Sequence, residues 1–215
     1  MTFVSWAALY EGSSDAAYFG IILPRLMDDL ILQRGVRAST IPTSPAVLLK
    51  RGDVGTVARE ACDSAGAFHL VFIHADTGGR ALEAGLDERS TAYCEAMHAL
   101  CGIDPRRCIA VTPRHETEAW ILCDPEAIME ALGYRGAPAD LGLPSDAQQA
   151  ESLVDPKAIL KQAVATARGR RREQPVGILY TAIAQRQRFD TLRRSPSFRD
   201  FEDRLIVSLQ SLGCI

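Results

Sequence analysis

Short apolar runs alternate with helical segments over the first part of the chain. The runs occupy residues 3–9, 36–41, 68–74 and 108–112. Residues 68–74 (FHLVFIH) form the clearest of them, and such near-continuous apolar character is typical of a strand buried on both faces. The runs therefore predict four strands in the interior of an α/β fold.

Apolar side chains in the intervening segments recur at the three- and four-residue spacing of a helix. These segments are residues 16–34, 47–61 and 88–100. Pro24 lies inside the first of them and is expected to kink or divide that helix. The alternation of strand and helix predicts a mostly parallel four-stranded sheet, flanked by helices and connected by right-handed crossovers.

The second part of the chain is predicted to be all helical. A helix is expected over residues 125–132, and another begins at Asp155, which is followed by Pro156 at the first helical position. Further helices are expected over residues 176–188 and 197–212. The stretch 133–154 is rich in Gly, Pro, Ala and Asp, and we interpret it as a long loop. We thus expect an α/β domain over residues 1–132 and a helical C-terminal region over residues 133–215 that packs on it.

The sequence has the composition of a globular protein and argues against a membrane-spanning or secreted one. Of 215 residues, 47% are hydrophobic and 24% are charged, as in an ordinary globular protein. No apolar run approaches the ~18–20 residues of a membrane span, and no basic flank precedes the first apolar run. We therefore expect a cytoplasmic protein without a membrane partner.

The net charge of −3 gives no overall signature of nucleic-acid binding, but the charges are unevenly distributed. Between Arg168 and Arg204 the chain carries ten arginines and five acidic residues. This basic stretch is either a surface for backbone phosphates or a solvated, partner-binding helical face.

The six cysteines form no C-x-x-C pair, so free buried thiols are expected. One cluster allows an alternative. Cys94, His98 and Cys101 share one face of a predicted helix, and Cys108 follows, so a zinc site is conceivable. The same spacing also fits simple core packing.

Acidic residues follow three of the predicted strands. Glu11 follows the first strand, Asp76 follows the third, and Glu116 and Glu118 follow the fourth. If these strands are neighbours, the carboxylates converge and repel one another unless a cation lies between them. Oxygen ligands of this kind suit Mg²⁺ or Mn²⁺. The alternative is a set of separate acids that are solvated or cap helices.

The strand–Glu11–Gly12 turn, the strand–Asp76 turn and the α/β order resemble a Toprim domain, the metal-binding module of topoisomerases, primases and nucleases of the overcoming-lysogenisation-defect type. A closer resemblance is to an uncharacterised Toprim-like bacterial family whose members often lie beside ABC-type or AAA ATPases in antiphage defence loci. It rests on four pieces of sequence: Glu11-Gly12-x-x-Asp15, His74-Ala75-Asp76, Glu118-Ala119-Trp120-Ile121-Leu122-x-Asp124 and Asp155-Pro156-Lys157.

This resemblance implies roles for individual residues. Glu11 matches the catalytic Toprim glutamate, a general acid/base that also belongs to the metal site, and Asp76 matches a magnesium-binding aspartate. Glu118 would complete the metal site, with His74 and Glu116 as further candidate ligands. His74 stands where the Toprim pattern has its first aspartate, and imidazole is a better ligand for Mn²⁺ or Zn²⁺ than for Mg²⁺.

The function expected from this resemblance is a Mg²⁺- or Mn²⁺-dependent nuclease that acts with an ABC- or AAA-type ATPase in antiphage defence. Six arginines would hold the nucleic-acid backbone: Arg168, Arg170, Arg171, Arg172, Arg193 and Arg194. A non-catalytic module that docks on an ATPase is the main alternative, favoured by His74, and a small-molecule phosphohydrolase is a third. A homo-oligomer is left open.

Overall fold

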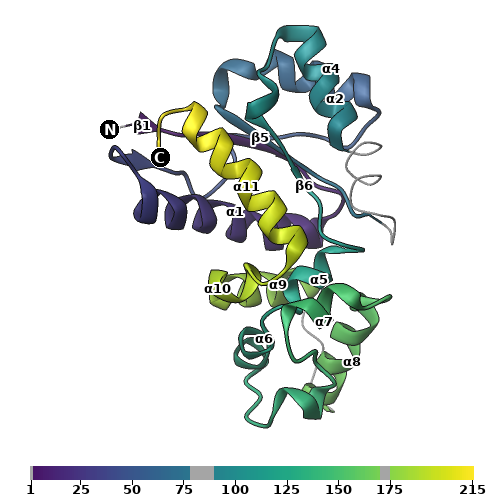
Figure 1. Cartoon of the computed structure of the whole chain (residues 1–215). Coiled ribbons are helices and arrows are strands. Elements are labelled where there is room, and N and C mark those ends of the chain that lie inside the picture. The colour runs from purple at the N-terminus through teal and green to yellow at the C-terminus, as the bar shows by residue number, and fades with distance from the viewer. Residues whose placement is uncertain (1, 78–89, 170–174) are drawn as a thin grey trace.

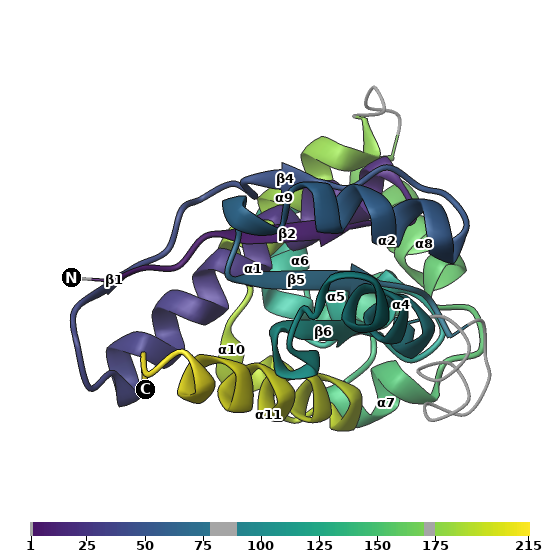
Figure 2. The same ribbon diagram turned by 90° about the horizontal axis from the view of Figure 1, so that it is seen from above.

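The computed structural model describes residues 2–77, 90–169 and 175–215. Its centre is an all-parallel four-stranded sheet with the order β4-β2-β5-β6. The strands are β2 (Trp6–Leu9), β4 (Val47–Leu48), β5 (Leu70–His74) and β6 (Cys108–Val111). Figure 2 shows them side by side in this order. The predicted α/β fold with a parallel sheet and flanking helices is therefore confirmed.

Helices cover both faces of the sheet, which explains why β2 and β5 are buried at every residue. The helices α1 (Ser13–Arg34) and α11 (Pro196–Ser211) pack on one face, and α2 (Val54–Asp63) and α4 (Ala92–Cys101) pack on the other (Figure 1). Alternate residues of β2 divide between the two cores, with Ala8 facing α1 and Ala7 facing α2. This alternation fixes which strand-end side chains face which layer.

The identity of one strand differs from the prediction. Within residues 36–41 only β3 (Ser39–Thr40) forms, and it pairs with β1 (Thr2–Phe3) in a separate two-stranded sheet. The fourth strand of the main sheet is instead β4, which the helical pattern of residues 47–61 had assigned to a helix. That helix begins only at Val54, because Asp53 caps it by accepting a hydrogen bond from the Thr56 backbone N–H. Residues 46–49 are thereby left to pair with β2.

Pro24 does not divide the first helix. Helix α1 is continuous from Ser13 to Arg34, and Pro24 is buried within it. Gly12 is the N-cap of α1, and no side chain in the described part of the chain caps this helix.

The C-terminal helices lie beyond the carboxyl ends of the strands and along one face of the sheet (Figure 1). They are α5 (Thr117–Ile121), α6 (Pro125–Leu132), α7 (Ala147–Ser152), α8 (Pro156–Arg168), α9 (Val176–Arg186), α10 (Phe189–Leu192) and α11. Within the described ranges, 3₁₀ turns occur at Ala65–Ala67, Pro105–Arg107 and Pro138–Leu141. The stretch 133–154, predicted as a loop, thus contains a short helix and a 3₁₀ turn. None of the helices in the described ranges has the length and apolar character needed to cross a bilayer.

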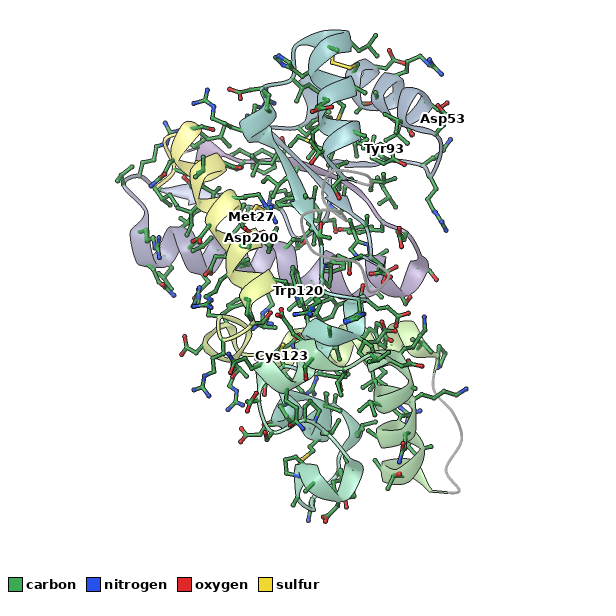
Figure 3. The ribbon with its side chains drawn as sticks, turned by 45° about the vertical axis from the view of Figure 1, so that its right-hand side comes forward. Met27, Asp53, Tyr93, Trp120, Cys123 and Asp200 are labelled. Carbon is green, nitrogen blue, oxygen red and sulfur yellow. A yellow bond between two sulfur atoms is a disulfide. The ribbon has the colours of Figure 1, made fainter. Side chains whose placement is uncertain are left out.

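Trp120 joins the C-terminal helices to the sheet layer (Figure 3). Its ring lies on α5 and makes edge contacts with Phe19 of α1 and Phe198 of α11. The indole N–H donates a 2.7 Å hydrogen bond to Ser197 Oγ. A single buried cluster therefore extends from the sheet into the helical C-terminal region.

Two disulfides replace the free thiols that the sequence analysis expected. Cys62–Cys101 ties α2 to α4, and Cys94–Cys108 ties α4 to β6. Only Cys123 and Cys214 are free, and both are buried. The alternative of a zinc site at Cys94, His98, Cys101 and Cys108 is also wrong for this structure, because its three sulfurs are all consumed in disulfides. These pairs are distant in sequence, and only the packing of α4 against its neighbours brings them together.

Candidate active site at the carboxyl edge of the sheet

The strand order creates a crevice between β2 and β5. The chain leaves β2 toward the α1 face and leaves β5 toward the opposite face, so the two connections diverge at the carboxyl edge of the sheet. Such a switch point is where open α/β sheets place their ligands. A cavity of about 460 Å³ lies here. Its lining includes Tyr10, Glu11, Arg51, Gly52, His74 and Tyr93.

Glu11 lines this crevice directly after β2, as the sequence predicted for a residue at a strand end. It is followed by Gly12, where an added Cβ would lie only 3.1 Å from Asp15 Oδ2. A side chain at position 12 would therefore press on the Asp15 carboxylate. The turn thus keeps Glu11 at the crevice and Asp15 on the α1 side of it.

His74, at the end of β5, is held by a chain of polar contacts. Thr117 Oγ1 donates a 2.7 Å hydrogen bond to Asp15 Oδ1 and lies 3.2 Å from His74 Nε2. His74 Nε2 is also 3.3 Å from Asp76 Oδ1. The single hydroxyl proton of Thr117 is used toward Asp15, so Thr117 can only accept from His74. His74 Nε2 is therefore the donor in this contact.

Two buried polar atoms beside the crevice lack a partner. Within the described ranges, neither His74 Nδ1 nor the Tyr10 hydroxyl makes a hydrogen bond. Both residues are almost completely buried, at 2% and 7% exposure, and both rings pack against Phe19. Burial raises the pKa of Tyr10, so its hydroxyl keeps its proton. Buried groups of this kind are normally satisfied, which makes these two atoms candidates for ligand contacts.

Glu118 is buried on α5 and already has two partners. The Tyr180 hydroxyl donates a 2.6 Å hydrogen bond to Glu118 Oε1, and Lys157 Nζ lies 3.8 Å from the same oxygen. Burial raises the pKa of Tyr180, and the negative charges of Glu118, Asp15 and Glu116 raise it further. Glu118 is thereby tied to the helical C-terminal region through Tyr180.

Glu116 is the least satisfied of these acids. It is the N-cap residue of α5, yet its side chain makes no capping bond, and its Oε2 is buried without a hydrogen-bond partner among the described residues. Burial raises its pKa, and repulsion by Glu118 and Asp76 adds to this, while Lys157 opposes it. The charges of Glu118 and Asp76 thus both disfavour ionisation of Glu116.

The connections after β5 and β6 are tied together beside these acids. The His115 N–H donates a 2.7 Å hydrogen bond to Thr77 Oγ1. His115 has a φ of 67°, a left-handed conformation that costs a non-glycine residue about 1–2 kcal/mol. Strain of this type accumulates at functional sites, and here it orients the segment that carries Glu116.

The side chains at this edge are of the types that bind a divalent cation, but they are not arranged to hold one. Asp76, Glu116 and Glu118 offer carboxylate oxygens, the donors that Mg²⁺ and Mn²⁺ prefer. However, no group of three or more His, Cys, Asp or Glu side chains in the described ranges is arranged to hold a metal ion. A bound metal would therefore require side-chain movements.

The arginines proposed for phosphate binding that the structure describes differ in their surroundings. Arg193 is paired with Glu202 at 2.8 Å and with Asp29 at 2.6 Å. Arg194 is exposed and lines a different cavity with Arg188, whereas Arg168 ends α8. The predicted positions Arg170, Arg171 and Arg172 lie outside the described residues.

Sequence reasoning missed four residues of this site. Asp15 and Lys157 belong to the pieces Glu11-Gly12-x-x-Asp15 and Asp155-Pro156-Lys157, which was a signal that could have been used. Thr117 and Tyr180 gave no signal, because they reach the site only through contacts spanning 102 and 62 residues of sequence.

Residues 10–206 match the family described as Domain of unknown function (DUF4276), and the chain belongs to this family. No curated protein and no solved structure matches it.

Proposed function

We propose that this DUF4276 protein is a metal-dependent nuclease of the Toprim type that hydrolyses phosphodiester bonds of DNA or RNA at the carboxyl edge of its sheet. The observation that carries the proposal is Glu116, a carboxyl group that neighbouring acids repel and whose buried Oε2 has no hydrogen-bond partner among the described residues. A cation bound here would relieve the repulsion and supply the missing contact.

Asp76, Glu116 and Glu118 are the residues that would hold Mg²⁺ or Mn²⁺ in this proposal. When bound, such an ion stabilises the charge of a phosphoryl group and lowers the pKa of a bound water. Glu11 is placed at the crevice as the general acid/base, in keeping with the resemblance to Toprim domains. Asp15 and Thr117 act through His74, whose ring orientation they fix.

The remaining parts of the proposal rest on the sequence resemblance. The partner would be an ABC- or AAA-type ATPase, the setting antiphage defence, and the place of action the cytoplasm. In this scheme Arg168 and Arg194 contact the nucleic-acid backbone, whereas Arg193 is already engaged by the carboxylates of Asp29, Asp190 and Glu202. A homo-oligomer is compatible with it.

A non-catalytic module that docks on an ATPase is the second candidate. The observation favouring it is His74, which replaces an acid of the Toprim pattern and whose Nε2 is occupied by Thr117 and Asp76. In this case the same polar network would serve only to hold the carboxyl edge together.

Cleavage assays separate the two candidates. Supercoiled plasmid, single-stranded DNA and RNA are incubated with Mg²⁺ or Mn²⁺ and with wild type, Glu11→Gln or the control Glu130→Gln, which alters an exposed glutamate on α6. We expect Glu11→Gln to lower the rate about 10²–10³-fold and the control to leave it unchanged. Equal rates for wild type and Glu11→Gln overturn the assignment. No cleavage by any form supports the docking module, and hydrolysis of free nucleotides alone supports a phosphohydrolase.

A further inference from the structure

The cavity at the switch point has two walls of different chemistry. One wall comes from the ends of β2 and β5 and contains Glu11 and His74. The other comes from the segment before α2 and from the first turn of α4, and it contains Arg51, Gly52 and Tyr93. Figure 3 shows Tyr93 close to Asp53, the residue that caps α2. The second wall has no role in the acid site described above.

Arg51 supplies a cation at the mouth of this cavity. Its side chain is exposed, and it makes no hydrogen bond or ion pair with any residue in the described ranges. By contrast, Arg188 and Arg193 are both held by carboxylates. A guanidinium with all its donors open is suited to a phosphate group, which it contacts through two parallel hydrogen bonds.

Tyr93 supplies an aromatic surface that is fixed in place. Its hydroxyl donates a 3.2 Å hydrogen bond to the Gly52 carbonyl, which spans the gap between α4 and the segment before α2. The adjacent Cys94 is bonded to Cys108 of β6, and Cys101 of the same helix is bonded to Cys62 of α2. The half-buried ring is therefore held in position before any ligand arrives, and an aromatic ring of this kind is a stacking partner for a nucleobase.

His74 and Tyr10 contribute to the opposite wall of the cavity. Their atoms Nδ1 and Oη are buried and have no hydrogen-bond partner among the described residues, so a ligand would reach them only after a side-chain movement.

From these features we propose that the cavity receives one unstacked nucleotide, with its phosphate at Arg51 and its base against Tyr93, beside Glu11. This inference rests on the nuclease proposed above and names the part of the substrate that it takes. A cavity of about 460 Å³ is in the size range of small-molecule sites and does not admit a base-paired duplex. The substrate must therefore present a single-stranded segment or a frayed end.

Binding of a mononucleotide tests the site independently of cleavage. A nucleoside 5′-monophosphate is titrated in EDTA into wild type, Arg51→Ala, Tyr93→Ala and one control. The control, Arg59→Ala, removes an exposed arginine of α2 that does not line the cavity. We expect millimolar or tighter binding by wild type, at least about tenfold weakening in Arg51→Ala and Tyr93→Ala, and a change under about threefold in the control.

The proposal is overturned if wild type does not bind the mononucleotide, or if Arg51→Ala and Tyr93→Ala bind it as wild type does. Inorganic phosphate and the unphosphorylated nucleoside are titrated in parallel. Each must bind more weakly than the monophosphate, because each contacts only one half of the site. If inorganic phosphate binds as tightly as the monophosphate, the proposal of a nucleotide site is also wrong.

Cleavage then distinguishes failure of this site from failure of the nuclease. If wild type binds the mononucleotide but cleaves no substrate, the proposal of a nucleotide site stands and the proposal of a nuclease is wrong. If wild type shows metal-dependent cleavage that Arg51→Ala and Tyr93→Ala leave unchanged, the proposal of a nuclease stands and the proposal of a nucleotide site is wrong. Both proposals together predict that wild type cuts single-stranded DNA or RNA faster than duplex, and that the two variants lose this difference.

Discussion

The hydroxyl of Tyr180 donates a 2.6 Å hydrogen bond to Oε1 of Glu118. Tyr180 lies on α9 in the helical C-terminal region, and Glu118 lies on α5 directly after the last strand of the sheet. Both side chains are buried. The helical region therefore does more than cover the sheet, since it provides the donor that holds one of the acids of the candidate site.

Removing this donor should destabilise the protein. Tyr180→Phe keeps the ring but removes the donor from the buried Glu118 carboxylate, whose other partner among the described residues is the more distant Lys157 at 3.8 Å. We expect the free energy of unfolding in urea to fall by about 1–3 kcal/mol. Tyr134→Phe is the matched control, because its hydroxyl bonds an exposed Asp140 at 3.3 Å, and it should change stability by less than about 0.5 kcal/mol. Equal effects of the two substitutions would show that the Glu118 contact contributes nothing special.

Thr117 is expected to act as the link between Asp15 and His74. Thr117→Val preserves the shape of the side chain but removes the hydroxyl that donates to Asp15 and accepts from His74. Two buried groups then each lose a hydrogen-bond partner, so we expect a loss of about 1–3 kcal/mol in unfolding free energy. Thr117→Ser retains the hydroxyl and should recover most of the polar contribution. If Val is tolerated better than Ser, the network does not stabilise the fold.

The stability of the metal-free protein should decrease as Glu116 ionises. Burial and, after it, the charge of Glu118 raise the pKa of Glu116 above its ordinary value of 4.5. The folded state therefore binds this proton more tightly than the unfolded state, and the resulting stabilisation is complete below pH 4.5 and is lost as the pH rises through the folded pKa. In EDTA, Glu116→Gln should raise Tm relative to wild type at neutral pH, and the difference should vanish in acid. A difference independent of pH would exclude this cause, and Glu130→Gln provides the control.

The two disulfides can be tested by counting the reactive thiols of the unfolded protein. Unfolded without reductant, the protein should expose two reactive thiols, Cys123 and Cys214, out of six cysteines. The bridges close segments with sequence separations of 39 and 14, so reduction of both should lower the unfolding free energy by at least about 2–4 kcal/mol. Six reactive thiols in protein isolated under thiol-blocking conditions would show that the bridges do not form in the cell. Two reactive thiols would instead argue against the cytoplasm as the place of action, because disulfides are rare there.

Strands of the sheet were predictable where the sequence is apolar at nearly every position. Leu70–His74 and Trp6–Leu9 are apolar at almost every position, since both of their faces meet helices. Val47–Leu48 was missed because two residues are too few to establish a period, and their apolar spacing continued into that of the following helix. Its place at the edge of the sheet is set by backbone pairing with β2, which no side-chain pattern records.

The candidate site was predictable only as a list of acids at strand ends. Glu11 and His74 do line the same crevice, since parallel strands present their carboxyl ends at one edge. The residues that hydrogen-bond to these side chains could not be predicted. Thr117 and Tyr180 are ordinary in sequence and acquire their roles through contacts across α1, α5 and α9. Disulfide pairing was likewise hidden, because cysteine spacing alone does not define which helices pack together.

The central claim is that the carboxyl edge of the sheet holds a divalent cation, and a crystal structure determined with Mn²⁺ tests it most directly. Anomalous scattering locates the ion without assumptions about its ligands. We predict an anomalous peak at bonding distance from carboxylate oxygens of Asp76 and Glu116. This peak should be absent from crystals of the Glu116→Gln variant. A structure at saturating Mn²⁺ without a peak at this edge would contradict it.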